Sequence, residues 1–228
     1  MSLVFGAAAT DEVALAAGLN NQHTFTILMW HYPTTRTNGR YFSYKGASAE
    51  KGVFWSNVGN GPHLGVARAT LAASAESSKT YTLNQWWYNA FTYDESDGPR
   101  IFSGDLATLA SEDSSVGGFP VVGTGASSDD SGAGWRFGGA AVLSRAYQGR
   151  IAIFAHYRRR FSLAEIIAYQ FLPRTDADCD IFIEAGWNGT ATQPNWTTLG
   201  AGINGTVAGA TVGPHVPLAS PFGREAVA

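Results

Sequence analysis

Three absences narrow what this chain of 228 residues can be. A single cysteine, Cys179, excludes an internal disulfide framework and fits folding in a reducing cytoplasm. No run of about eighteen apolar residues is present and the N-terminus has no basic region, so we expect neither a membrane span nor a signal peptide. Fifteen basic against eighteen acidic residues, without a basic cluster long enough to follow a phosphate backbone, argue against a nucleic-acid partner.

Common catalytic and metal-binding patterns are also missing. The five histidines show no paired zinc-ligand spacing, and no Gly-x-Ser-x-Gly elbow marks a serine nucleophile. Asp176, Asp178 and Asp180 alternate as calcium ligands can, but Ile181 and Trp187 stand where an EF-hand loop needs glycine and a carboxylate. We therefore predict no enzymatic activity and no cofactor, and calcium has no support beyond that alternation.

What the chain does contain is a series of short segments rich in apolar and β-branched residues. Residues 24–32 are apolar on both faces in their second half, which is typical of a central strand. An Asn38-Gly39 hairpin turn follows, and residues 111–134, rich in Ser, Gly and Asp, are predicted to form a long exposed loop. Further strands are expected at residues 41–44, 53–56, 64–67, 79–83, 86–93, 100–102, 135–137 and 151–157. This spacing predicts two packed antiparallel sheets.

One segment changes to a helical pattern. Ser162 and Glu165 form a capping box, and Phe161 can pack on Ile166 across the first turn. Pro173 ends the segment. The sequence therefore predicts one short helix near residues 162–171 in an otherwise all-β protein.

Four blocks, in their order along the chain, resemble a known family. The blocks are FTILMW (25–30), QWWYNAFTYD (85–94), WRFGG (135–139) and YQGRIAIFAHYRRRFSLAEI (147–166). They resemble the laminin-G-like jelly roll of the concanavalin A-like lectin and glucanase superfamily, of the kind that phages encode as virion proteins. The resemblance implies an all-β, two-sheet antiparallel jelly-roll sandwich. Glucanases of that superfamily carry carboxylates in a Glu-x-Asp-x-x-Glu-like pattern, which this chain lacks.

We expect a jelly-roll domain at residues 1–172 and a C-terminal extension at residues 173–228, with an extra strand and an arm. The extension contains GINGTVAGAT (202–211), which resembles the segment that usually precedes such a jelly roll. Four roles are open for it: an edge strand of its own sandwich, a truncated second copy, an arm that pairs with a neighbouring subunit, or a strand followed by a loose tail.

Five residues are candidates for a binding surface, either an interface or a glycan site. Trp55, Trp187 and Trp196 sit among Ser, Asn and Gly, and we expect them at exposed or interfacial positions. Arg158 and Arg159 follow a strand and are candidates for holding an anionic glycan or an acidic neighbour, with simple solvation as the alternative.

Two functions follow from these expectations. The first is a non-enzymatic structural protein of a phage virion, a capsid decoration or cement protein that folds in the host cytoplasm and adheres to the capsid or to neighbouring subunits. The alternative is a carbohydrate-binding, lectin-like module that recognises host surface glycans. The expected partners are capsid or other virion proteins, further copies of the chain, or glycans.

Overall fold

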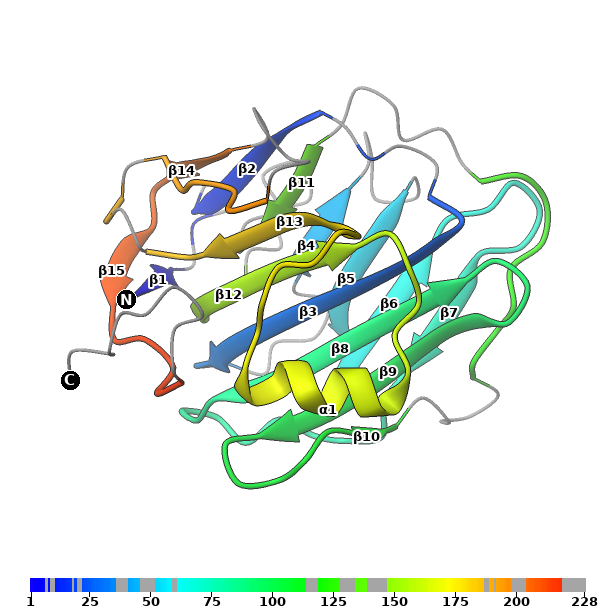
Figure 1. Ribbon diagram of the computed structural model, residues 1–228, viewed down its shortest axis with the longest axis horizontal. Coiled ribbons are helices and arrows are strands. Elements are labelled where there is room, and N and C mark those ends of the chain that lie inside the picture. The colour runs from blue at the N-terminus through cyan, green and yellow to red at the C-terminus, as the bar shows by residue number, and fades with distance from the viewer. Residues whose placement is uncertain are drawn as a thin grey trace.

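Two antiparallel β-sheets pack face to face, and one helix lies against the outer face of the larger sheet (Figure 1). This architecture confirms the predicted all-β sandwich with one short helix. The computed structural model describes residues 1–6, 8, 11–17, 19, 22–35, 41–45, 52–58, 61–113, 119–127, 134–138, 147–186, 189–190, 192–197 and 204–218. Within those ranges no helix is both long and apolar enough to cross a membrane.

The larger sheet has eight strands, and the smaller has seven. The eight-stranded sheet runs β10 (Ser111–Glu112), β9 (Gly98–Asp105), β8 (Trp87–Asp94), β3 (Thr24–Pro33), β12 (Gly149–Tyr157), β1 (Ser2–Phe5) and β15 (Thr211–Gly213), with β13 (Cys179–Glu184) also paired to β12. The seven-stranded sheet runs β14 (Gly205–Ala208), β2 (Glu12–Ala17), β11 (Gly134–Phe137), β4 (Tyr41–Lys45), β5 (Val53–Val58), β6 (Gly61–Val66) and β7 (Ala73–Glu76).

The main core lies between the two sheets and is rich in aromatic rings. Phe137 of β11 and Phe154 of β12 stack with their centroids 5.0 Å apart, which joins the sheets at one point. Trp55 of β5 meets Phe91 of β8 at 4.0 Å between centroids, which joins them at another. Because side chains alternate along a strand, each of these strands sends every second residue into this core.

A second apolar layer explains why β3 is apolar on both faces. Helix α1 (Leu163–Phe171) crosses the outer face of the eight-stranded sheet (Figure 1). Trp30 of β3 donates its indole N–H to the carbonyl of Gln170 at 2.8 Å, and Tyr88 donates its hydroxyl to the carbonyl of Ile166 at 3.1 Å. The capping box predicted at Ser162 and Glu165 is present at the start of α1.

Two details differ from the sequence expectations, and a third falls outside the described residues. Residues 79–83 form no strand and lie in the connection from β7 in one sheet to β8 in the other. Residues 111–134 are not simply a loop: they begin with β10, and residues 119–127 bridge to residues 68–74 through isolated pairs such as Ser74 with Val121. The predicted turn at residues 38–39 lies outside the described residues.

The C-terminal extension supplies strands to the same sandwich. β13 pairs with β12 along Ile153 to Tyr157. β14 pairs with β2 and ends the seven-stranded sheet, while β15 pairs with β1 and ends the eight-stranded sheet. Residues 205–213 therefore take the first of the four open roles, that of edge strands in their own sandwich. The division of the chain after residue 172 stays a prediction.

Candidate functional site

Trp55 is buried in the core rather than placed at a surface. Its side chain is 0% exposed and packs against the rings of Phe91 and His31. It points inward from β5 because it shares the phase of Val53, which is also buried, while Phe54 points outward. The expectation of an exposed or interfacial Trp55 is therefore wrong, and this ring cannot touch a surface ligand.

The other two tryptophan candidates have different outcomes. Trp196 is partly buried at the rim of the second apolar layer, and its backbone N–H donates to the carbonyl of Phe182 at 3.0 Å. Its placement at an interface and its role in binding stay predictions. Trp187 lies outside the described residues.

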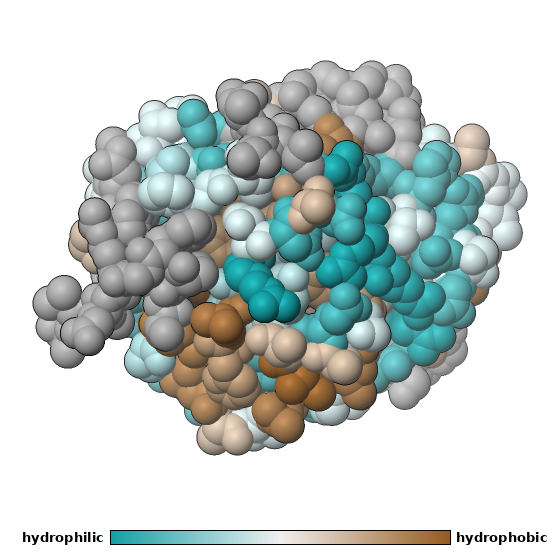
Figure 2. Space-filling view, in the orientation of Figure 1, coloured by the Kyte–Doolittle hydropathy of each residue, from teal (hydrophilic) through white to brown (hydrophobic). Residues whose placement is uncertain are grey.

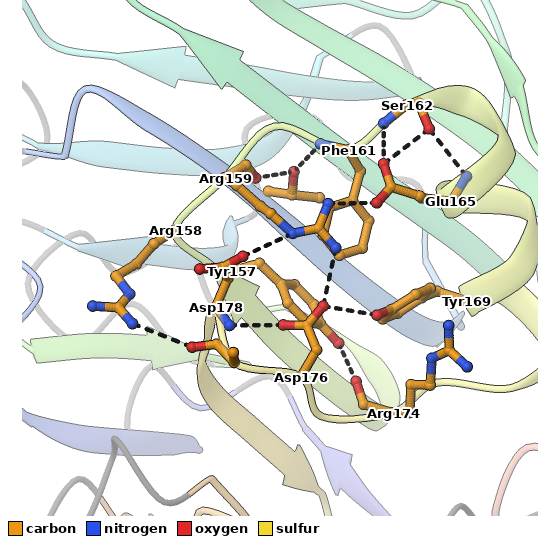
Figure 3. Close-up of polar contacts among 12 residues, drawn as sticks. Tyr157, Arg158, Arg159, Phe161, Ser162, Glu165, Tyr169, Arg174, Asp176 and Asp178 are labelled. Atoms are coloured by element: carbon orange, nitrogen blue, oxygen red, sulfur yellow. Dashed lines mark hydrogen bonds and ion pairs between the residues drawn. The ribbon is translucent and has the colours of Figure 1, made fainter.

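Arg159 is enclosed by carboxylates. Its Nη1 contacts Glu165 at 2.5 Å, its Nη2 contacts Asp176 at 3.0 Å and its Nε contacts Asp178 at 3.1 Å (Figure 3). Its guanidinium also lies 4.3 Å from the ring centroid of Phe161. Each of its three nitrogen atoms is thus engaged within the chain, which argues against Arg159 as the holder of an anionic glycan.

Arg158 is paired as well, although 45% of its side chain is exposed. Its Nε contacts Asp180 at 3.1 Å, and its Nη2 donates to the carbonyl of Ala177 at 3.3 Å. Neither simple solvation nor a free cationic patch describes these two arginines. Their binding role stays a prediction, whereas their contacts tie the loop after β12 to the segment between α1 and β13 (Figure 3).

The three alternating aspartates serve this same cluster. Asp176, Asp178 and Asp180 each pair with an arginine, and Tyr169 also donates its hydroxyl to Asp176 at 2.8 Å. Burial alone would raise the pKa of Asp176, but the hydrogen bonds from Tyr169 and Arg159 hold that pKa below its usual value. In the part of the chain that the structure describes, no three His, Cys, Asp or Glu side chains are grouped to hold a metal ion.

A second polar cluster lies inside the core. His31 Nε2 contacts Asn89 Oδ1 at 2.7 Å, and the hydroxyl of Tyr81 donates to the same oxygen at 2.8 Å. Asn89 in turn donates to Ser103 Oγ at 2.8 Å. All four side chains are nearly or fully buried between the sheets, so we assign them a structural role.

The outer face of the seven-stranded sheet carries partly exposed aromatic rings. Phe54 of β5 and His63 of β6 project there because they alternate with the inward-facing Trp55 and Leu64. Their ring centroids are 5.9 Å apart and their planes differ by 36°. The ring of Phe54 leans across Gly65, where a Cβ atom would fall 2.1 Å from Phe54 Cζ. Only glycine at this position lets the ring lie against the sheet.

A third ring stands against the first two. Phe119 meets His63 with centroids 6.3 Å apart and planes at 81°, so its ring is nearly perpendicular to the imidazole. The paired backbones of Ser74 and Val121 hold the segment of Phe119 beside β7. Phe54 and His63 thus form a floor and Phe119 a wall. We call these three residues the aromatic corner.

Polar groups border the aromatic corner. Ser56 Oγ lies 3.4 Å from His63 Nδ1, and burial lowers the pKa of His63, so the imidazole is neutral at pH 7. Glu76 of β7 is directly opposite His63 in the strand register and shares its face of the sheet. This site was not among the sequence predictions. Alternation along residues 53–56 places Phe54 and Trp55 on opposite faces of a strand, but it does not say which of the two faces the core.

Comparison with known proteins identifies the fold. No family model matches the chain, and no curated protein matches it in sequence. A solved structure of a Bacteroides ovatus protein assigned to carbohydrate binding is similar, with a TM-score of 0.59 at 12% identity over 92% of this chain. The chain spans 58% of the length of that protein.

Two further structures share the fold. The heptameric SAP-like pentraxin of Limulus polyphemus has a TM-score of 0.51 at 13% identity, over 74% of this chain and 80% of the pentraxin. Domain 4 of the extracellular arabinanase AbnA of Geobacillus stearothermophilus, solved with arabinotriose, has a TM-score of 0.52 at 17% identity, over 73% of this chain and 75% of that domain. These likenesses agree with the predicted jelly-roll sandwich, and none of them concerns a virion.

Proposed function

We propose that the protein is a non-catalytic carbohydrate-binding module whose aromatic corner receives a sugar ring. The observation that carries the proposal is the group of partly exposed rings of Phe54, His63 and Phe119 on an outer sheet face. Aromatic rings offer a large apolar surface against which the C–H groups of a sugar can pack, and a few polar groups nearby can orient its hydroxyls. The names of two compared structures, from B. ovatus and from the arabinanase, concern carbohydrates.

The virion role predicted from the sequence has less support. That hypothesis followed from the resemblance to phage virion proteins, and it was favoured by the expected absence of catalysis and by a C-terminal arm that pairs with a neighbour. In the described residues of the extension, β13, β14 and β15 instead pair with strands of their own sandwich. No observation of the fold favours capsid decoration over glycan recognition, so the virion role stays a prediction.

Replacing Phe54 by alanine tests the proposal. Loss of one stacked ring removes about 1 kcal/mol of interaction, so we expect the variant to bind its glycan roughly five- to tenfold more weakly. Affinity electrophoresis through gels that contain neutral polysaccharides provides the measurement. Phe171→Ala is the matched control, because Phe171 is a partly exposed phenylalanine at the end of α1, outside the seven-stranded sheet. Equal retention of Phe54→Ala and wild type would contradict the proposal.

A further inference from the structure

Glu76 is a charged residue beside the aromatic corner, directly opposite His63 in the strand register. Glu76 has no hydrogen bond or ion pair with any of the described residues. The other described carboxylates all have polar partners, as in the pairs of Glu12 with Arg136 and Glu112 with Arg100. The remaining ones are Asp11, Asp94, Glu95, Asp97, Asp105, Asp113, Glu165, Asp176, Asp178, Asp180 and Glu184.

Glu76 is also placed to reach a ligand in the corner. It lies on β7, next to His63 of β6, and both side chains leave the sheet on the same side. Its side chain is partly exposed rather than fully solvated. A sugar ring resting on the floor formed by Phe54 and His63 would therefore lie within reach of a carboxylate that has no partner within the described chain.

The described groups around Glu76 do not cancel its charge. Burial lowers the pKa of His63, so this neighbour is uncharged at neutral pH. Arg68 is 4% exposed and contacts Glu95, and Lys79, three residues after Glu76, donates its Nζ to the carbonyl of Ser103 and to Ser111 Oγ. Both of these cations are thus engaged by groups other than Glu76.

We infer that the site takes an uncharged, hydroxyl-bearing sugar and discriminates against anionic ones such as uronates, sulfated sugars and sialic acids. This inference rests on the proposed function. A carboxylate accepts hydrogen bonds from two neighbouring hydroxyls of a neutral sugar, and such charge-assisted bonds are stronger than neutral ones. The same carboxylate repels a second negative charge brought within a few ångströms. The preference is thus the reverse of the one expected from Arg158 and Arg159.

The test is the variant Glu76→Gln, which keeps the size of the side chain and removes its charge. The probes are neutral arabinan, xylan, mannan and β-glucan, and anionic polygalacturonate and dextran sulfate. We expect wild-type protein to bind at least one neutral polymer and neither anionic one. Glu76→Gln should bind the neutral polymer about tenfold more weakly, because a charge-assisted hydrogen bond is lost. It should also gain binding to polygalacturonate.

Glu112→Gln is the matched control. It changes the net charge by the same amount, but Glu112 lies on β10 of the other sheet. We expect it to bind all six polymers as the wild type does, and circular dichroism verifies that both variants are folded. A wild-type preference for an anionic polymer, or equal affinities of the two variants for the neutral one, overturns the inference while leaving glycan binding intact. Wild-type protein that binds none of the six polymers overturns the proposed function, and the inference with it.

Discussion

His31 is a titratable side chain held without charge between the two sheets. Burial lowers its pKa from 6.5 to about 4, although the hydrogen bond to Asn89 opposes that shift. Between these pH values the unfolded chain binds a proton that the folded protein does not. The contribution of His31 to the free energy of unfolding is therefore fully present above pH 6.5. It falls by about 3 kcal/mol as the pH drops from 6.5 to 4.

The variant His31→Gln isolates this effect. We expect a shallower loss of unfolding free energy between pH 6.5 and 4 than in the wild type, measured by urea unfolding at a series of pH values. His215, whose pKa burial also lowers to about 4, should account for part of the remaining slope. His23→Gln is the control, because the His23 side chain is 66% exposed. If the pH dependence of His31→Gln equals that of the wild type, this account of His31 is wrong.

At the scale of elements, α1 is fastened to the β9–β10 connection by one side chain. Gln170 Oε1 accepts a hydrogen bond from the backbone N–H of Ala110 at 2.7 Å, and its Nε2 donates to the carbonyls of Asp105 and Thr108. Beside this junction Leu109 and Phe171 have exposed side chains. Figure 2 shows an apolar area on the face of the molecule where α1 lies. Polar contacts rather than burial of these two side chains therefore hold the end of the helix.

Replacing Gln170 by alanine should lower the free energy of unfolding by about 3 kcal/mol, because buried backbone groups lose their partners. Ser162→Ala, which removes only the cap of the same helix, should cost about 1 kcal/mol. The midpoints of urea unfolding measure both values. A Gln170→Ala variant that is as stable as Ser162→Ala would contradict this value and show that water replaces most of the glutamine contacts.

At the scale of the whole molecule, the two ends of the chain meet in both sheets. β1 pairs with β15, and β2 pairs with β14. Val216 and Leu218, which follow β15, also bury their side chains in the second apolar layer. The C-terminal strands β14 and β15 thus form the outer edges of the two sheets, next to the N-terminal strands β2 and β1.

Deletion of residues 204–228 should therefore destabilise the sandwich itself. We expect a fall in Tm of more than 10 °C or aggregation, because two edge strands and the buried side chains that follow them are lost. Differential scanning calorimetry gives the measurement. A truncated protein with an unchanged Tm would instead indicate an extension independent of the jelly roll, as the predicted division after residue 172 implies.

The predictions that succeeded and those that failed depended on different kinds of information. The capping box of Ser162 and Glu165 was predictable because both residues lie in one helical turn. Most strands were predictable because alternation is local. The prediction of an exposed Trp55 was wrong because local alternation does not say which of the two faces of a strand is turned toward the core. The pairing of Arg159 was not predictable, because the carboxylates of Asp176 and Asp178 lie almost twenty residues away along the chain and meet it only in the fold. Arg159 was therefore a candidate for anion binding.

The sequence by itself therefore determined the β-rich class, the positions of most strands and the start of the helix, since each of these depends on neighbours along the chain. The tertiary structure alone decided which rings became core and which became surface. Strand register places Phe54, His63 and Glu76 on one face, and packing of the two sheets turns Trp55 away from it. The candidate site exists only through these long-range pairings, because its residues come from separate strands and a separate loop.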